Sequence, residues 1–304
     1  MRKIASILCL CAGISLSAQT ESDALFMDKH NLCGGFVYGN TTWDHYWEGT
    51  FYRNNANIGS FKSNSVMAMA NYGIARGLNV IASAAWIDNR VTAGTLIGQK
   101  GIQDLNVFLK KEIWAKDIKG FNSSLVAVGG VSAPLTDYVV DFLPISIGMR
   151  SKTASLRLLG DVQKGHWYGT ASAMYTRRNN ITIDRNSYYT TELIYSNKMF
   201  MPDVFSYNIR LGWRDGADKY FELIADRMNT LGGFDIRKND MPLPGNNMDA
   251  FRAGVNIKYP VPVLNGLSVM VTGMQTLSGR NMGKARMIMA GVVYQTAFMK
   301  GDKK

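Results

Sequence analysis

The chain has 304 residues, a formal net charge of +11 and 46% apolar residues, with 30 glycines, 14 tyrosines and only 7 prolines. Its length allows one large domain or two small ones. Lys and Arg residues are scattered singly rather than clustered, so the positive charge does not indicate nucleic-acid binding. Beyond the N-terminal region there is no run of about eighteen apolar residues, which excludes a transmembrane helix.

The N-terminal 18 residues have the pattern of a cleavable signal peptide. Arg2 and Lys3 supply a positive n-region, residues 4–16 an apolar stretch too short to span a bilayer, and Ser17-Ala18 a small-residue exit. We expect cleavage after Ala18. Residues 19–304 then form a single exported domain.

The cysteines bear on two alternatives. A lipoprotein signal using Cys9 or Cys11 is disfavoured, because leucine precedes each cysteine where a small residue is expected. After cleavage only Cys33 remains, so an intrachain disulfide framework is excluded. We expect Cys33 to be a small buried apolar residue.

A period of two is the main structural signal, since successive strand side chains point to opposite faces. Between Phe205 and Trp213 every second residue is apolar, and the residues between them are polar or glycine. The same split recurs at 251–259, less cleanly at 104–113, and at 153–163, where only Leu159 is out of place. The pattern suits either a soluble antiparallel sandwich or a membrane barrel with lipid on its apolar face.

The spacing of the strands favours the barrel. Connections alternate between tight turns and long loops, which is typical of outer-membrane barrels, whereas a soluble sandwich has no reason to sort its loops by length. The sequence thus predicts an all-β, closed antiparallel transmembrane β-barrel of about 12 strands (12–14). An even count places both termini in the periplasm. The predicted strands are 34–43, 66–75, 79–88, 102–114, 121–133, 153–163, 166–178, 204–214, 219–228, 249–259, 265–277 and 286–298.

Aromatic residues near the predicted strand ends agree with interfacial girdles, although strands of a soluble sheet also favour such residues. In the last strand Gly291, Tyr294 and Phe298 have the spacing of the assembly signal that ends many outer-membrane barrels, here followed by a polar tail. The girdle candidates are Trp86, Trp114, Trp167, Trp213, Tyr259, Tyr294 and Phe298.

Three short Gly-rich segments resemble a known family. They are residues 101–105 leading into Lys110-Lys111, residues 72–74 followed by 78–80, and residues 279–281 before the last strand. Over roughly 66–298 the chain is similar to the outer-membrane family named for the meta-cleavage pathway of phenol degradation. That family lies within the superfamily of long-chain fatty acid and aromatic hydrocarbon transporters. The resemblance implies a monomeric barrel that admits small hydrophobic or aromatic compounds by diffusion.

The resemblance does not imply phenol as the substrate. The larger members of the superfamily have about fourteen strands and an N-terminal plug. Here the predicted strand count is lower and the segment before the first strand is short, so the sequence leaves open whether an equivalent plug forms.

Charged side chains on the polar faces are the candidate lumen residues. Nearly matched charges in a confined interior either pair across strands as a structural ladder or, where left unpaired at a constriction, attract anionic solutes such as carboxylates. A pore of about twelve strands is narrow once side chains fill it. The candidates for the lumen lining and solute path are Lys110, Arg157, Arg210, Arg214, Arg252, Lys258, Asp104, Glu112 and Asp161, with Glu222 and Asp226 beside them.

No catalytic site is predicted. Of the three histidines, His30 precedes the first strand and His166 lies at a tight turn, so only His45 in residues 43–48 has carboxylates close by. Strand alternation would point His45 and the flanking carboxylates apart unless the segment curls. The sequence has no His/Cys metal spacing and no Gly-rich phosphate loop before a helix, so no metal or cofactor is expected.

Two connections have alternative interpretations. The polar residues 48–62 could fold into the lumen as a constriction or form an ordinary outside loop. Residues 239–248 carry Met241 and Met248, which could contact apolar solutes as they enter. A solvent-exposed loop shaped by proline is the favoured interpretation.

The sequence therefore predicts an outer-membrane barrel for passive passage of small hydrophobic, aromatic or amphiphilic solutes. Outer-membrane lipids, the solute and the barrel-assembly machinery are the expected partners, and we expect a monomer. A non-transporting structural or surface-interaction barrel and a barrel enzyme acting on lipid are the alternatives.

Overall fold

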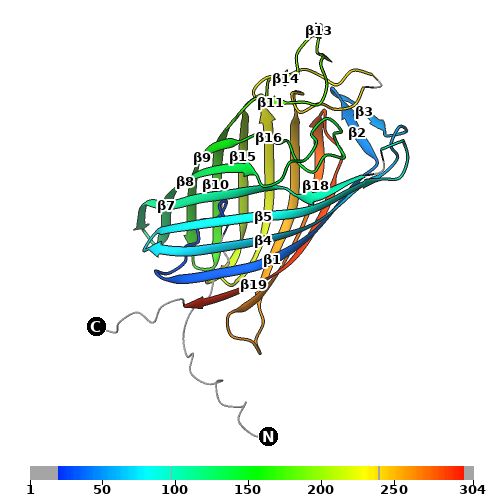
Figure 1. Cartoon of the computed structure of the whole chain (residues 1–304). Coiled ribbons are helices and arrows are strands. Elements are labelled where there is room, and N and C mark those ends of the chain that lie inside the picture. Colours follow the sequence, from blue (N-terminus) through cyan, green and yellow to red (C-terminus); the bar gives the residue numbers. More distant parts are fainter. Residues whose placement is uncertain (1–19, 97, 239, 298–304) are drawn as a thin grey trace, which may run out of the picture.

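Twelve antiparallel strands close into a barrel in the computed structural model, which describes residues 20–96, 98–238 and 240–297 (Figure 1). Closure is complete because β1 pairs with β19 on one side and β4 on the other, with Asn31 opposite Ala297. The predicted fold class and all twelve predicted strands are confirmed. The barrel strands are β1 (Asn31–Trp43), β4 (Phe61–Ala75), β5 (Leu78–Val91), β7 (Asp104–Ile118), β8 (Phe121–Pro134), β9 (Thr153–Lys164), β10 (Trp167–Arg178), β15 (Val204–Asp215), β16 (Lys219–Thr230), β17 (Asp249–Pro260), β18 (Leu267–Arg280) and β19 (Arg286–Ala297).

Short strands extend the barrel at its long-loop end. Strand β6 (Gly98–Ile102) precedes β7 and pairs with the upper part of β5. The loops add three small ladders: β2 (His45–Glu48) with β3 (Phe51–Asn54), β11 (Ile181–Thr182) with β14 (Lys198–Met199), and β12 (Tyr188–Tyr189) with β13 (Leu193–Ile194).

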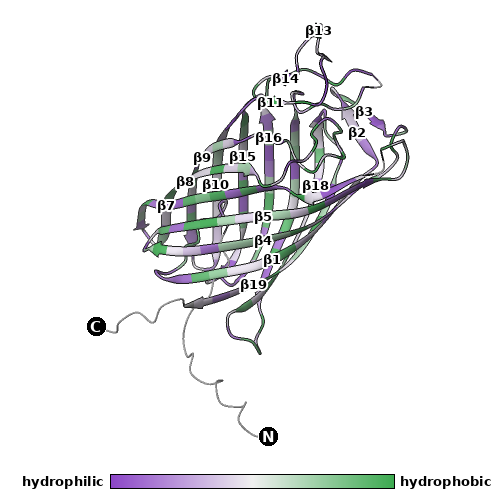
Figure 2. Ribbon diagram, viewed as in Figure 1, coloured by the Kyte–Doolittle hydropathy of each residue, from purple (hydrophilic) through white to green (hydrophobic). Residues whose placement is uncertain are grey.

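The outer surface of the barrel is apolar. On β9, Leu158 is 51% exposed on the outside while its neighbour Leu159 is completely buried. Green, hydrophobic positions alternate with paler and purple ones along the strands (Figure 2). Exposed apolar surface on this scale suits hydrocarbon rather than water, and a closed barrel leaves no unpaired strand edge in the lipid. Other outward side chains are Leu156, Ile209, Leu211, Val255, Ile257, Val271 and Val292.

Tight turns and longer loops alternate along the chain as predicted, except at the last pair, where the 261–266 turn is longer than the 281–285 loop. The turns at one end include Gly77, Gly120, Gly165 and Gly216, each with a positive φ that glycine adopts without strain. Loops at the other end span 44–60, 92–97, 135–152, 179–203, 231–248 and 281–285. In the part of the chain that the structure describes, no helix is long and apolar enough to cross a membrane.

The segment before β1 lies inside the barrel, which answers a question that the sequence left open. We call residues 20–30 the N-terminal segment. Its Ala24 and Phe26 pack against a buried cluster formed by Val126, Val128 and Leu159 on the inner faces of β8 and β9. Leu159, the one residue that broke the alternation on β9, is therefore apolar because it contacts this segment.

The base of the N-terminal segment is fixed beside β4. The backbone N–H of His30 donates to the carbonyl oxygen of Gly73, and its ring Nδ1 lies 3.0 Å from the hydroxyl oxygen of Tyr72. Met27 packs against Cys33 and Val293. Cys33 is 3% exposed, as predicted for a small buried residue.

Three long loops pack together over the barrel mouth in what we call the loop cluster. Loop 135–152 also contacts the barrel wall, since the Asn89 side-chain amide donates to the carbonyl oxygens of Ile145 and Ser146. The favoured interpretation of 239–248 as a solvent loop is wrong in part, because Leu243 and Met248 are buried. The loop cluster consists of Tyr138, Val140, Ile147, Ile181, Ile183, Tyr188, Met199, Met201 and Leu243.

The β2–β3 hairpin leans outward against the β18–β19 connection rather than into the lumen (Figure 1). Tyr46 bridges to Gly283, and the Trp47 N–H donates to the Met282 carbonyl oxygen. Of the two interpretations of 48–62, the structure thus supports the outside loop. Loop 135–152 is the one that reaches the inner wall.

Most of the girdle candidates face outward. Trp86, Trp114, Trp167, Tyr259 and Tyr294 are all exposed on the barrel surface. Trp213 is partly covered, with the His166 ring against it and Lys219 over its face. Phe298 lies outside the described residues.

Candidate functional site

The barrel encloses a cavity of about 330 Å³, which we call the lumen chamber. Thr20, Glu21 and Ser22 of the N-terminal segment form part of its lining. The remaining lining comes from inward positions on ten strands: β1, β4, β5, β7, β9, β15, β16, β17, β18 and β19. The chamber has two chemically different sides.

One side is built from six methionines, which we call the methionine wall: Met67 and Met69 on β4, Met270 and Met274 on β18, and Met287 and Met289 on β19. They occupy alternate inward positions, and Met274 lies directly opposite Met287 in the ladder. On β1, between β4 and β19, Gly39 keeps space for them: a Cβ there would lie 2.6 Å from Ser65 Oγ. The result is a flexible apolar surface, since thioether side chains adapt to varied shapes.

The other side carries Arg157, Arg210, Arg252 and Asp226, which we call the arginine wall. Arg210 donates to Glu222 Oε1 at 2.8 Å and also to Ser22 Oγ of the N-terminal segment. Arg252 pairs with Asp226. These two arginines are therefore held by carboxylates of β16.

Arg157 is different, because no strand carboxylate pairs with it. Its guanidinium donates to Ser172 Oγ at 3.0 Å and approaches Met174 Sδ at 3.4 Å. The nearest carboxylate is Glu21 of the N-terminal segment, 3.9 Å from Arg157 NH2. Arg157 is 8% exposed, and its buried Nε has no hydrogen-bond partner among the described residues.

Below the chamber, toward the tight turns, the predicted residues form a dense ion-pair network. Lys110 is completely buried and donates to Asp23 Oδ1 and to the carbonyl oxygens of Thr20 and Leu25. Arg214 pairs with Asp161 at 2.7 Å, and Lys258 with Asp218 at 3.0 Å.

The two remaining predicted residues lie at different levels of β7. Asp104 is at the long-loop end and accepts a hydrogen bond from the Tyr138 hydroxyl at 2.6 Å, which fixes loop 135–152. Glu112 lies near the β4–β5 turn, where a Cβ on Gly77 would be 3.1 Å from the Glu112 Cβ. The nine candidates therefore occupy three levels: Asp104 at the mouth, Arg157, Arg210 and Arg252 at the chamber, and Lys110, Glu112, Asp161, Arg214 and Lys258 below it.

Sequence reasoning missed the methionine wall and the N-terminal segment. The signal for the wall was present, since Met67/Met69 and Met287/Met289 are spaced by two residues. Spacing alone does not say whether such a stripe faces lipid or lumen. On β4, the polar residues Ser65 and Asn71 lie on the same face as Met67 and Met69, which indicates that this face points inward.

The His45 cluster, which lies outside the lumen, has no arrangement typical of a catalytic site among the residues that the structure describes. Asp44 Oδ1 lies 2.8 Å from His45 Nδ1, because β1 ends at Trp43, β2 begins at His45, and the chain bends between them. This bend is the exception under which the two side chains were not expected to point apart. The His45 ring stacks on Tyr52 at the outer surface. Within the described residues no three His, Cys, Asp or Glu side chains come together as a metal site.

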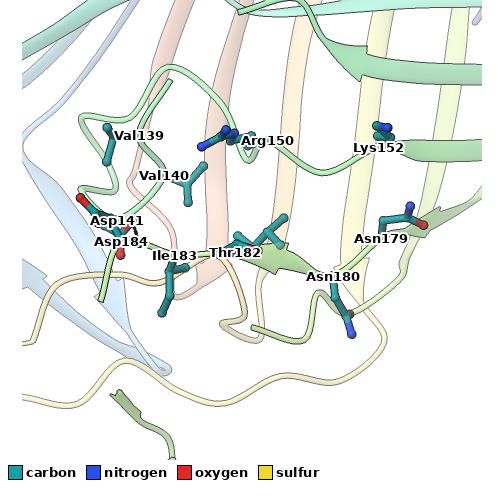
Figure 3. A pocket seen from close by; sticks show the side chains of 11 residues that line it. Val139, Val140, Asp141, Arg150, Lys152, Asn179, Asn180, Thr182, Ile183 and Asp184 are labelled. Carbon is teal, nitrogen blue, oxygen red and sulfur yellow. Dashed lines mark hydrogen bonds between the residues drawn. The ribbon is translucent and has the colours of Figure 1, made fainter. Parts of the chain in front are cut away.

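A second cavity of about 570 Å³ lies between loops 135–152 and 179–203 (Figure 3). Arg150, Lys152, Asn179 and Asn180 contribute polar groups to its lining. Asp141 at its edge is already held by the Arg185 guanidinium and the Asp184 N–H. The cavity is a feature of the loops and lies apart from the lumen chamber.

Comparison with known proteins defines the fold. No family model and no curated protein matches the sequence. An outer-membrane channel from Pseudomonas putida F1 matches with a TM-score of 0.72 and 12% identity, covering 92% of this chain and 100% of that chain. The KdgM porin (TM-score 0.43, 8% identity, covering 86% of this chain and 98% of that chain) and OprD of Pseudomonas aeruginosa (0.37, 9%, 94% and 99%) are more distant.

The protein is thus a porin-like outer-membrane β-barrel in its fold. More particularly, its fold matches that of the outer-membrane channel from Pseudomonas putida F1 over 92% of this chain and the full length of that channel.

Proposed function

We propose that the protein is an outer-membrane channel for passive passage of small hydrophobic, aromatic or amphiphilic solutes. The observation that carries the proposal is the methionine wall inside a closed barrel. Water-filled pores for hydrophilic solutes have polar interiors, whereas six inward methionines give a solute-facing surface suited to apolar groups.

The proposal includes the route of the protein to the membrane. Residues 1–18 act as a signal peptide, the barrel-assembly machinery inserts residues 19–304 into the outer membrane, and the tight turns and both termini face the periplasm. The exposed apolar belt contacts outer-membrane lipids, and the barrel works as a monomer. A channel of this fold needs no energy source and no enzyme activity.

A second candidate function is a non-transporting structural barrel. The buried pairs of Lys110 with Asp23 and of Arg214 with Asp161 favour it, because they fill the lumen below the chamber together with the N-terminal segment. The fold is compatible with both functions. They differ in whether a solute path opens through this level.

Liposome flux separates the two. The full mature chain is refolded into phospholipid vesicles, and uptake of indole and of glucose is followed over time. Faster entry of indole than in empty vesicles supports the channel. A barrel that stays closed to both solutes under every condition supports the structural role.

The lipid-enzyme alternative has its own measurement. Phospholipid turnover by the refolded protein is compared with that of a His45→Ala variant. Turnover that the variant abolishes would establish an enzyme, whereas equal values for both proteins remove this alternative.

A further inference from the structure

The lumen chamber combines an apolar side with a cation that lacks a carboxylate partner on any of the described strands. The methionine wall occupies β4, β18 and β19, while Arg157 reaches in from β9 on the other side. A purely apolar solute would make favourable contacts only with the methionine wall. A purely polar solute would satisfy only the arginine wall.

Among the described residues, Arg157 lacks a full set of hydrogen-bond acceptors. Its Nε is buried without an acceptor, and a buried guanidinium group left in this state carries the full desolvation cost of the missing hydrogen bond. The side-chain partners that it does have, Ser172 Oγ and Met174 Sδ, are uncharged. The neighbouring arginines differ, since Glu222 and Asp226 neutralise Arg210 and Arg252.

Glu21 shows where the anion would lie. The carboxylate approaches to 3.9 Å of Arg157 NH2, which is longer than a hydrogen bond, and its side chain is 33% exposed. It belongs to the N-terminal segment rather than to a strand. Its position can therefore be taken by another carboxylate without breaking any pairing in the barrel.

We propose that the lumen chamber binds small amphiphilic carboxylates, with the carboxylate on Arg157 in place of Glu21 and the apolar body against the methionine wall. This inference rests on the proposed function and names its substrate class. A guanidinium binds a carboxylate through two parallel hydrogen bonds, which would use the vacant Nε. The volume of about 330 Å³ is at the small end of ligand pockets and suits a single ring with a short acid chain.

Matched probes test the head group. Binding of 3-phenylpropanoate and of its neutral analogue 3-phenyl-1-propanol to the full mature chain is measured by calorimetry in zwitterionic micelles, with blank micelles subtracted. We expect the acid to bind about tenfold more tightly than the alcohol, corresponding to one charge-assisted hydrogen-bonded pair. Equal affinities, or no binding of either probe, would overturn the inference.

Variants test the two partners. Arg157→Gln should abolish the preference for the acid and leave the alcohol unaffected. Glu21→Gln, which lies outside every strand, should tighten acid binding several-fold because it removes the competing carboxylate. The control is Arg227→Gln, an exposed residue paired with Asp249 away from the chamber, which should behave like the wild type. If Glu21→Gln leaves or weakens acid affinity, Glu21 does not occupy the anion position and the inference fails.

Flux distinguishes failure of this inference from failure of the proposed function. If vesicles pass indole but the protein shows no preference for the acid, the channel stands and the carboxylate site does not. If no probe passes and none binds, both fail.

Discussion

Asp23 Oδ1 accepts a hydrogen bond from Lys110 Nζ at 2.8 Å, with the lysine completely buried inside the barrel. The ammonium also lies 5.0 Å from the centre of the Phe26 ring. Two oxygens of the backbone, at Thr20 and Leu25, complete its shell. The contact holds the N-terminal segment to β7, so its loss should loosen that segment.

Asp23→Asn should release the N-terminal segment. Removing one member of a buried ion pair costs about 3–5 kcal/mol, because the remaining charge is left unpaired. Here that cost is relieved if the segment leaves and water hydrates Lys110. Single-channel conductance should therefore rise or fluctuate between two levels. Asp28→Asn, at an exposed carboxylate of the same segment, is the control, and conductance equal to wild type in both variants would contradict the prediction.

Leu158 and Leu159 form a matched pair on opposite faces of β9. Leu158→Arg puts a charge on the lipid side and should reduce the free energy of unfolding from bilayers by about 2–4 kcal/mol if the position is near the midplane. Leu159→Ala removes packing against Phe26 and should loosen the N-terminal segment. Unfolding in urea measures the first effect and conductance the second. The result would be contrary if the Leu159 variant left conductance unchanged.

Tyr138→Phe should free loop 135–152 from the wall. The hydroxyl donates to Asp104 and accepts from the Arg150 N–H, and both bonds are lost in the variant. Burial and the Asp104 contact raise the pKa of Tyr138, so the hydroxyl stays protonated and keeps donating at all physiological pH values. Indole flux into vesicles should increase while the melting behaviour of the barrel is retained. Unaltered flux would mean that this loop does not limit entry.

Asn281→Ala should separate three loops without unfolding the barrel. The Asn281 side chain accepts from the Gly49 and Ile236 N–H groups and donates to Asp235 and to the Asn247 carbonyl oxygen. Its φ of 51° favours asparagine over alanine. Loss of these bonds should cost a few kcal/mol locally, at about 1 kcal/mol each. Hydrogen exchange at Gly49 and Ile236 should accelerate by more than tenfold. Protection as in the wild type would show that Asn281 does not hold these loops together.

Acid should open the same loops. The hydrogen bonds from Arg280 hold the pKa of Asp235 below its ordinary value of 3.8. The folded loops therefore favour the ionised carboxylate, and this stabilisation is complete above pH 3.8 and is lost as the pH falls through the lower folded pKa. Hydrogen exchange of the 231–248 loop should rise at that point. Asp235→Asn should remove the acid step, and a step that persists in this variant would assign it to another group.

The barrel was predictable because alternation and loop length are strong periodic signals. A pattern such as Phe205 to Trp213 fixes which side chains share a face, and closure follows from the need to leave no strand edge in lipid. The predicted strand ends agree with the structure to within a few residues, with β4 the exception: its N-terminal part from Phe61 is polar, and its sequence predicts a loop.

The interior was less predictable, since contacts within a lumen depend on what fills it. Strand periodicity identifies Lys110 as facing inward but cannot say that its partner is Asp23, which lies in no strand. The apolar residues 24–27 next to polar Asp23 were a signal for the N-terminal segment, as was Leu159. The methionine wall required the register of β4, β18 and β19 to be known.

The N-terminal segment is joined to the barrel through His30, whose positive φ turns the chain at the edge of β1. A solute carboxylate that displaces Glu21 therefore competes with a side chain that is tethered to the barrel. The effective local concentration of this side chain is in the millimolar range or above. Trace amounts of a solute would leave the lumen occupied. Only a high external concentration of the carboxylate solute would displace Glu21, so the barrel would bind its solute at high external concentrations and not at low ones.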